Sequence, residues 1–407
     1  MYGANGRVFH ARGRKTSRVI REFLRSESAS GFLLMAAAAA GFLWANTPAH
    51  GAYESLLHVG LPLPFGERLA HLNLHHWVND GLMAVFFLLV GLEIKREVLI
   101  GELSSPSRAA LPAIAAVGGM ALPALICAAF VWSDPARLLG WAIPAATDIS
   151  FALAVLTLLG RAVPSSLKVF LTALAVIDDL GAILIIAFFY TDSLNLAALG
   201  GGLGALALLV ALNRMRVSSL APYLAIGLVM WGCFVESGVH ATIAGVALAF
   251  TIPLRARKEP DSPVKALEHA LLPAVSYVIL PVFGFANAGV TLLDASPSVV
   301  AGRLPLGIAC GLFFGKQAGI FAFARAAIAG GAAQLPKGTN AMMLYGVALL
   351  GGIGFTMSLF IGTLAFADEA LLTEMKIGVF LGSALSALAG YLVLRAALAR
   401  QARATDS

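Results

Sequence analysis

Charged side chains are scarce in this chain of 407 residues: Asp, Glu, Lys and Arg make up only 12% of it, whereas 59% of the residues are hydrophobic. A soluble domain carries about 25% charged residues, so the composition excludes an ordinary water-soluble protein. Apolar runs of about 18 residues or more recur along the whole length, and each is long enough to cross a bilayer. The sequence therefore predicts a protein embedded in the lipid bilayer.

Cysteine is also rare, and its pattern excludes a metal site. Cys127, Cys233 and Cys310 lie far apart in apolar runs, so we interpret them as small core residues. No aromatic and basic patch of the nucleic-acid-binding kind occurs, and the net charge of +6 suits an anionic membrane surface. The basic amino terminus lacks an apolar stretch followed by a small-residue cleavage site, so no cleaved signal peptide is expected.

Backbone amides in lipid must be satisfied within their own segment, which favours a helix bundle. The apolar runs are too long and too uniform for alternating barrel strands. We predict an all-α polytopic membrane protein with about twelve transmembrane helices, at roughly 30–47, 76–100, 109–132, 137–160, 165–190, 194–213, 218–235, 238–254, 268–292, 304–330, 339–366 and 372–399.

Lys and Arg set the expected orientation. With the amino terminus in the cytoplasm, most of them fall in the two tails and the inner loops, whereas only four fall outside: Arg68, Arg137, Arg303 and Lys376. One more, Lys316, lies within a span. The predicted organisation is a basic cytoplasmic tail (1–29), one transmembrane domain (30–400) and a cytoplasmic carboxyl-terminal tail (401–407), in a bacterial inner membrane with both termini inside.

One outer loop, 48–75, is long and punctuated by Gly and Pro, so it predicts a small hairpin. Zinc binding by its histidines is one interpretation, but we expect solvated surface side chains at His71, His75 and His76. The glycine-rich run 200–209 has no preceding strand and predicts close helix packing through small residues.

Seven polar or charged residues stand out inside the predicted spans: Asp80, Glu93, Asp148, Asp178, Asp179, His240 and Lys316. An ionised group at mid-bilayer costs at least about 3 kcal/mol, so each needs a partner or a water-filled cavity. A purely structural ion pair is the alternative interpretation of Asp178, Asp179 and Lys316, but such a pair leaves one carboxylate over. Asp80 is expected to cap a helix or to be solvated, and His240 to make a polar contact between helices.

Two spans carry helix-breaking residues at their centres. Pro144 is expected to interrupt the fourth span just before Thr147 and Asp148. The eleventh span should unwind at three central glycines, which are Gly351, Gly352 and Gly354. Spans 3–5 and 10–12 form blocks that begin on opposite sides of the membrane, so the breaks occupy matching places in an inverted repeat and predict a transport site at the midplane.

If the interrupted helices cross, their dipole ends face each other at mid-membrane. A carboxylate suits the two positive ends and an ammonium suits the two negative ends, and Asp148 and Lys316 have these signs. Adjacent residues on a helix point about 100° apart, so Asp178 and Asp179 can face different neighbours. Their oxygens are hard ligands for a small cation, and their mutual repulsion favours holding protons. Mutual exclusion of proton and cation at one site predicts antiport.

Over residues of about 20–400 the sequence resembles the bacterial NhaA-type sodium/proton antiporters. The segments that carry the resemblance are "NDGLMAVFFLLVGLEIKRE", "PAATDISFALAVL", "LTALAVIDDLGAI", "VHATIAGV", "LEHALLPAVSYVILPVFGFANAGV", "GLFFGKQAGIF" and "GGIGFTMSLFIG". The resemblance implies electrogenic, pH-activated exchange of cytoplasmic Na⁺ or Li⁺ for external protons, with no cofactor. It also implies a homodimer formed through the 48–75 hairpin.

By this resemblance, Asp179 is the principal cation ligand and Asp178, beside it, pairs with Lys316 when no cation is bound. Asp148, helped by Thr147, would balance the crossed helices. The positions matching the family's pH response are Glu93, Arg96, Glu97, Glu268 and His269. The family's usual "LEHxLHP" reads "LEHALLP" here, with Leu272 in place of a second histidine, so the pH profile is expected to differ. An ordinary ion network at a helix end is the alternative for the first three of these.

Three other functions are alternatives. An intramembrane aspartyl protease also uses two buried carboxylates, but its Tyr-Asp and Gly-Asp dipeptides do not occur in this chain. An antiporter of the same fold could prefer another monovalent cation. A passive channel would have no need of a lysine that competes with the ion, because a buried lysine favours an occluded site.

Overall fold

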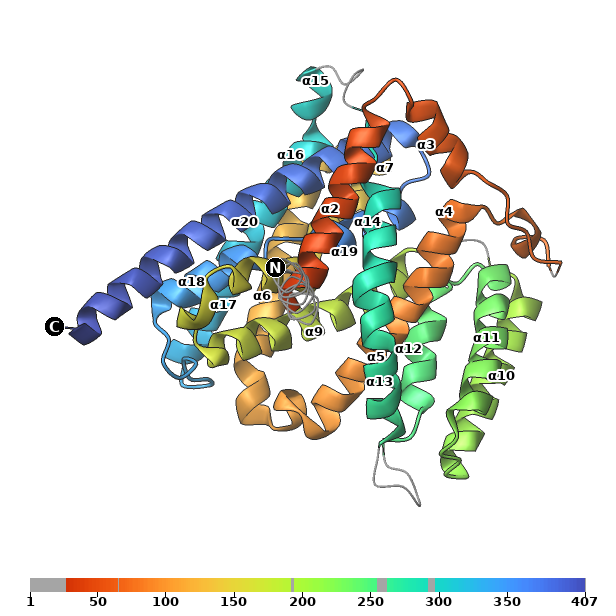
Figure 1. Ribbon diagram of the computed structural model, residues 1–407, viewed down its shortest axis with the longest axis horizontal. Helices are drawn as coiled ribbons and strands as arrows, with labels where there is room; N and C mark the ends of the chain where they lie inside the picture. Colours follow the sequence, from red (N-terminus) through yellow and green to blue (C-terminus); the bar gives the residue numbers. More distant parts are fainter. Residues whose placement is uncertain (1–26, 65, 192–193, 255–261, 292–296, 407) are drawn as a thin grey trace, which may run out of the picture.

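Helices make up most of the described structure, a computed structural model that describes residues 27–64, 66–191, 194–254, 262–291 and 297–406 (Figure 1). Within these ranges there is no β-sheet, and the one β-bridge joins Gly60 to Asn73. The first half of the chain forms α2 (Glu27–Ala45), α3 (His50–Leu57), η1 (Leu69–His71), α4 (Leu74–His76), η2 (Trp77–Leu82), α5 (Met83–Ile100), η3 (Glu102–Ser104), α6 (Pro106–Val131), α7 (Pro135–Leu138), η4 (Leu139–Ala145), α8 (Ile149–Thr157), η5 (Gly160–Ala162) and α9 (Ser165–Phe189).

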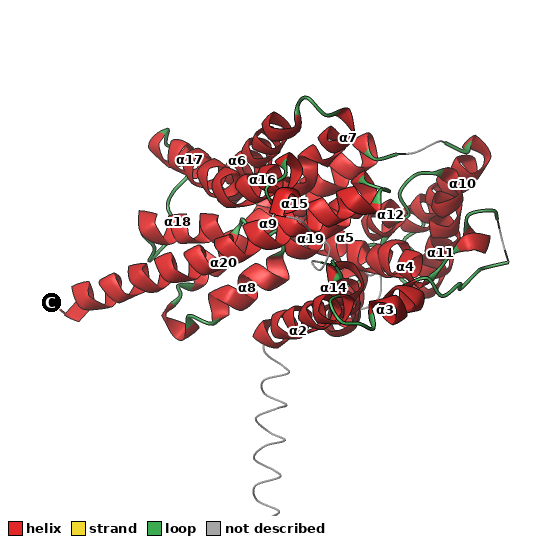
Figure 2. Cartoon of the chain, turned by 90° about the horizontal axis from the view of Figure 1, so that it is seen from above, coloured by secondary structure: helices red, strands yellow, loops and turns green. Residues whose placement is uncertain are grey.

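The second half forms α10 (Leu196–Arg214), α11 (Leu220–Ser237), α12 (Thr242–Thr251), α13 (Pro263–Ala274), η6 (Val275–Ile279), α14 (Leu280–Ala288), α15 (Pro297–Val300), α16 (Arg303–Cys310), η7 (Gly311–Gly315), α17 (Lys316–Ala329), α18 (Ala341–Leu350), α19 (Phe355–Ala365) and α20 (Glu369–Asp406). Figures 1 and 2 place α17, α18 and α20 on one side of the bundle and α10 and α11 on the opposite side. Most of the predicted 1–29 tail lies outside the described residues.

Seven described helices are long and apolar enough to cross a membrane, and counting three bent helix pairs as spans gives up to 10. The other two predicted spans correspond to α5 and α12. The 18-residue α5 carries four charged residues near one end, and the apolar α12 has only 10 residues, so neither qualifies by itself. The all-helical membrane fold is thus confirmed, and the count of twelve stays a prediction.

Both predicted helix breaks are present. The chain bends by 44° between Pro135–Ala145 and Ile149–Thr157, and by 41° between Ala341–Leu350 and Phe355–Ala365. Pro144 itself lies inside the 3₁₀ segment η4, and the backbone becomes extended two residues later, at Ala146. Proline lacks the amide proton that an α-helix needs there, so the tighter turn and the break follow from the same residue.

Side-chain caps fix where several helices begin. The side chains of Asn195 and Asn340 accept hydrogen bonds from the first-turn amides of α10 and α18, and Ser262 does the same for α13. These amides have no partner within the helix, so a short polar side chain at this position stabilises the helix start.

Close packing through glycine brings α6 against α17. A Cβ atom on Gly118 would collide with the backbone carbonyl of Gly319, and a Cβ on Gly319 would collide with that of Gly118. The two backbones can therefore approach only because neither residue has a side chain. In the predicted 200–209 packing segment, Gly202 likewise lies against Phe234 of α11, which confirms that interpretation, whereas Gly200 and Gly204 face open space.

The predicted loop hairpin is present between α3 and α4. The Leu61 amide donates to the Leu72 carbonyl at 2.8 Å, and the Leu74 amide donates to the Val59 carbonyl at 2.9 Å. We call the end of the bundle that carries these residues the hairpin end.

Candidate functional site

Lys316 and Asp178 form an ion pair where three segments meet. The lysine is the first residue of α17, and the aspartate lies in the middle of the continuous helix α9. Nζ of Lys316 lies 2.5 Å from Oδ2 of Asp178, and both side chains are fully buried. Thr147, in the break before α8, contacts both: Lys316 donates to its hydroxyl at 2.9 Å, and the hydroxyl lies 2.6 Å from Asp178 Oδ2. The structure thus brings together three of the predicted site residues.

The hydroxyl of Thr147 also connects the two helix breaks. Its oxygen lies 2.8 Å from the carbonyl oxygen of Gly351, at the carboxyl end of α18. A hydroxyl carries a single proton, so it can donate either to this carbonyl or to Asp178, and its lone pairs receive the Lys316 ammonium. The Lys316 ammonium, the Asp178 carboxylate and the Gly351 carbonyl therefore all contact the same hydroxyl.

Asp179 differs from its neighbour although both are buried. Its side chain is only 4% exposed, and its Oδ1 has no hydrogen-bond partner. The Oδ1 atom of Asp178 is also buried without a partner, because the lysine and the threonine both occupy Oδ2. An unpaired buried carboxylate oxygen is costly, and it is a site that a cation or a proton can satisfy. The two aspartates thus face different surroundings, as the helical turn predicts.

Asp148 caps two helices at once. Its Oδ1 accepts a hydrogen bond from the Phe151 amide at 2.9 Å, which caps α8. Its Oδ2 accepts from both the amide and the hydroxyl of Thr356, at 3.1 and 2.6 Å, in the first turn of α19. A carboxylate is stabilised near the positive amino-terminal end of a helix, and here it lies between two such ends.

Backbone contacts hold the two breaks together. The Asp148 amide donates to the Ile353 carbonyl at 2.6 Å, although the residues are about 200 positions apart in the sequence. The amides of Gly354 and Phe355 both lie within reach of the Ser383 hydroxyl of α20, at 3.3 and 3.2 Å. Gly352 packs against the Leu312 carbonyl, where no side chain would fit. The unwound backbone is therefore satisfied by protein groups and not by lipid.

At the end of α5 away from the hairpin lies a second group of charges, here called the mouth cluster: Glu93, Arg96, Glu97 and Glu268. Arg96 contacts Glu97 at 2.7 Å and Glu268, on α13, at 3.0 Å. His269 does not join this cluster among the described contacts, because its exposed ring bonds to the Lys265 carbonyl at 2.9 Å. Leu272 lies on the surface of the same helix with 46% of its area exposed.

The hairpin end contains a cavity of about 800 Å³ that Asp80 and His240 both line, together with the exposed His71 and His76. No group of metal ligands is present among the described residues. The expectation of a solvated His75 is wrong, because its ring is half-buried and contacts the Asn79 amide at 3.1 Å. Burial lowers the pKa of His75 to about 4, and the nearby Lys376 charge adds to this shift.

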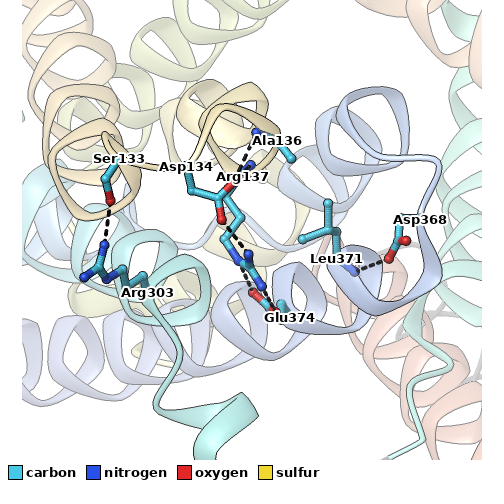
Figure 3. Close-up of polar contacts among 8 residues, drawn as sticks. All are labelled: Ser133, Asp134, Ala136, Arg137, Arg303, Asp368, Leu371 and Glu374. Carbon is cyan, nitrogen blue, oxygen red and sulfur yellow. Dashed lines mark hydrogen bonds and ion pairs between the residues drawn. The ribbon is translucent and has the colours of Figure 1, made fainter.

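Arg137 lies in α7, at the start of the first interrupted helix pair, and it connects this segment to the beginning of α20. Its guanidinium donates to Asp134 at 2.6 Å and to Glu374 at 2.6 and 3.0 Å (Figure 3). The hydrogen bonds from Arg137 hold the pKa of Asp134 below its usual value. The first half of the broken span is thereby fixed to α20.

Sequence reasoning missed several residues around the site. The count of Lys and Arg places Lys95 with the residues of the cytoplasmic loops. In the structure it is only 8% exposed, and its ammonium donates to the carbonyls of Phe250 and Ile252 at the carboxyl end of α12. Thr356 was not singled out, because it is the second residue of α19, after Phe355, and the N-cap position is taken by Gly354. The pairing of Gln317 with Tyr345 has no local signal, because it joins two helices.

The family model described as Na+/H+ antiporter 1 matches residues 21–394. A curated relative named Na(+)/H(+) antiporter NhaA, from Rhodospirillum rubrum, is 56% identical over 396 residues, which cover 95% of this chain and 99% of the relative. A second, named Na(+)/H(+) antiporter NhaA 2, from Pseudomonas syringae pv. syringae, is 55% identical and covers 92% of this chain and 94% of its own length. The Na(+)/H(+) antiporter NhaA of Bordetella parapertussis is 55% identical over 93% of this chain and 96% of the relative.

Proposed function

Because this chain belongs to the Na⁺/H⁺ antiporter family, which consists of transporters and not enzymes, we propose that it exchanges cytoplasmic Na⁺ or Li⁺ for external protons. The observation that carries the proposal is the buried pair Asp178 and Asp179, in which one carboxylate has a lysine partner and the other has an unpaired oxygen. A site with this surplus of negative charge can hold a cation or a proton, and holding one disfavours the other.

In the proposed cycle, Asp179 is the principal cation ligand and Asp178 assists it. The Lys316 ammonium neutralises Asp178 while no cation is bound, and the arriving ion weakens that ion pair and frees the lysine's proton for transport. Asp148 and the Thr147 hydroxyl keep the two interrupted helices together during exchange, which is consistent with their contacts to α19 and to Gly351. We propose that spans 3–5 and 10–12 form an inverted repeat around this site, with the interrupted helices crossing at mid-membrane.

We assign the remaining features by the same reasoning. Exchange is proposed to be electrogenic and activated at alkaline pH through the mouth cluster, in which Arg96 contacts both Glu97 and Glu268. The hairpin end is assigned to the outer face of a bacterial inner membrane, with both termini cytoplasmic and no resident cofactor. The 48–75 hairpin is the proposed homodimer contact. Deleting that segment and measuring the mass of the protein in detergent would test this assignment.

The central test uses everted membrane vesicles with a preformed acid interior. Addition of Na⁺ to vesicles that contain the wild-type protein should collapse the gradient, whereas Asp179→Asn should abolish this response and still yield a folded, inserted protein. Asp368→Asn is the matched control, because this exposed carboxylate caps α20 with an oxygen that asparagine keeps.

Wild-type exchange rates in well-folded Asp179→Asn would refute the assignment. Equal or larger responses to K⁺ would favour an antiporter of the same fold that prefers another monovalent cation. Cation movement without any counter-movement of protons would favour a channel.

A further inference from the structure

A π-helical turn, η7, comes directly before Lys316. The Lys316 amide donates to the carbonyl of Gly311, five residues earlier, which is the hydrogen bond of a π-turn. Such turns are rare and occur frequently at functional sites. One extra residue rotates the side chains that follow by about 100° relative to an uninterrupted helix. The turn therefore determines which side of α17 carries the lysine.

The backbone of this turn lies against two prolines. A Cβ atom on Gly311 would come within 2.8 Å of the Pro144 ring, and one on Gly315 would come within 2.6 Å of Pro123 Cα. Values below 3.0 Å are not tolerated without a shift, so both positions need glycine for this close approach. The turn is thus fixed on the side of the first helix break.

A single side chain, Gln317, holds the turn on its other side. Its Nε2 donates to the Phe313 carbonyl, inside the turn, at 2.7 Å. Its Oε1 accepts a short hydrogen bond from the hydroxyl of Tyr345, on α18. The glutamine is 7% exposed, so these contacts are shielded from water and strengthened by the low dielectric. One amide thereby connects the turn before Lys316 to the first half of the second broken helix.

We propose that Gln317 and Tyr345 are positioning residues that hold Lys316 against Asp178, an inference that rests on the proposed exchange function. Among the described contacts, neither side chain bonds to Lys316, Asp178 or Asp179, so both act through the backbone of the turn. The cation has to displace the lysine from Asp178. Loss of the Gln317–Tyr345 bond therefore weakens the ion pair and lets the cation compete more easily.

The test measures the apparent KM for Na⁺, the maximal rate and the melting temperature of purified protein, with the kinetics recorded in proteoliposomes. Tyr345→Phe removes the hydroxyl and keeps the ring, which packs edge-on against Phe321 with centroids 5.2 Å apart. We expect its KM to fall about threefold to tenfold, the effect of one hydrogen bond, with no increase in the maximal rate. Gln317→Leu removes this bond and also the bond to the Phe313 carbonyl, so it should act in the same direction. The double variant should show no larger effect than Gln317→Leu alone, because the tyrosine hydroxyl has already lost its partner there.

Tyr391→Phe is the matched control, because this tyrosine lies on α20 and its hydroxyl makes no hydrogen bond among the described residues. A KM of Tyr345→Phe that equals or exceeds the wild-type value overturns the inference, and so does a lowered melting temperature with unaltered KM, which would mark a purely structural pair. Wild-type protein that moves no protons on addition of Na⁺ overturns the proposed function and this inference with it. Wild-type exchange beside an unaltered Tyr345→Phe overturns the inference alone.

Discussion

The ammonium nitrogen of Lys316 lies 2.5 Å from Oδ2 of Asp178, in a place where neither side chain reaches solvent. Removing two charges from water has a large desolvation cost, which their mutual attraction offsets only when the geometry is good. Breaking such a pair from one side leaves an uncompensated buried charge. The first two predictions concern this buried ion pair.

Replacing Lys316 by methionine should lower the free energy of unfolding by about 3–5 kcal/mol, because Asp178 is then buried without its cation. The double variant Lys316→Met, Asp178→Asn should recover much of this loss, since both charges are gone. Thermal unfolding in detergent measures the cycle. A double variant no more stable than Lys316→Met would contradict the pairing seen here.

Replacing Lys316 by arginine keeps the charge but not an exchangeable proton, because a guanidinium does not release its proton at accessible pH. We expect Lys316→Arg to lose electrogenic exchange and to keep its thermal stability. Voltage generation and melting temperature should be measured on the same preparation. Electrogenic transport at near wild-type rate would leave Asp178 and Asp179 as the proton carriers.

The hydroxyl of Thr147 should matter more than its shape. Thr147→Val keeps the branched side chain but removes the contacts to Lys316, Asp178 and Gly351, so we expect a loss of about 1–3 kcal/mol in stability and a marked drop in exchange rate. Thr147→Ser retains the hydroxyl and is the control. Equal behaviour of the two variants in exchange and melting assays would show that the hydroxyl has no special part.

The shifted pKa of His75, at the hairpin end, should make the stability of the protein depend on pH. Burial lowers its pKa to about 4, whereas the unfolded histidine takes up a proton near pH 6.5. Above about 6.5 both states are neutral, so the residue adds no pH dependence there. As the pH falls from 6.5 towards 4, only the unfolded state binds the proton, and stability decreases.

His75→Gln should therefore show a smaller fall in melting temperature between pH 7 and pH 4 than the wild type. The exposed His71→Gln serves as the control and should follow the wild-type curve. Parallel curves for all three proteins would mean that His75 takes up its proton equally in both states.

Substitutions of Leu272 test the proposed pH response of the mouth cluster. It lies one helical turn after Glu268, on the same face of α13, and its exposure leaves room for an imidazole. We expect wild-type exchange to rise from about pH 6.5 to 8.5, where histidine and coupled carboxylates titrate. Leu272→His should move the midpoint without changing the maximal rate, and the uncharged Leu272→Gln should not. A midpoint that stays in place would remove this position from the pH response.

Several features of the site could be read from local sequence because their causes are local. The apolar runs predict membrane helices, Pro144 removes a helix hydrogen bond, and the glycines at 351–354 weaken a helix wherever it lies. Both breaks were therefore predicted within a few residues. The pair Asp178 and Asp179 stood out because carboxylates are rare at mid-span.

The partners of these residues depended on the tertiary structure. Lys316 and Asp178 are 138 positions apart, and Asp148 and Thr356 are 208 positions apart, so no periodicity or propensity encodes their contact. Lys95 shows the limit most directly: its neighbours in sequence are charged and suggest a solvated helix end, but packing of α5 on α12 buries it against the carbonyls of Phe250 and Ile252. His75 was misread for the same reason, because its neighbours include Asn287 and Lys376, which are far away in the sequence.

The sequence by itself determined that the chain resides in lipid, where two of its helices break, and that Asp148, Asp178, Asp179 and Lys316 lie within its spans. Only the tertiary structure decided that Asp178 receives the lysine while Asp179 keeps an unpaired oxygen, and that Asp148 caps two helices at once. The physical reason is that solvation and backbone propensity act on each residue through its immediate neighbours. Pairing depends instead on which faces of distant helices meet, and that is fixed by the packing of the whole bundle.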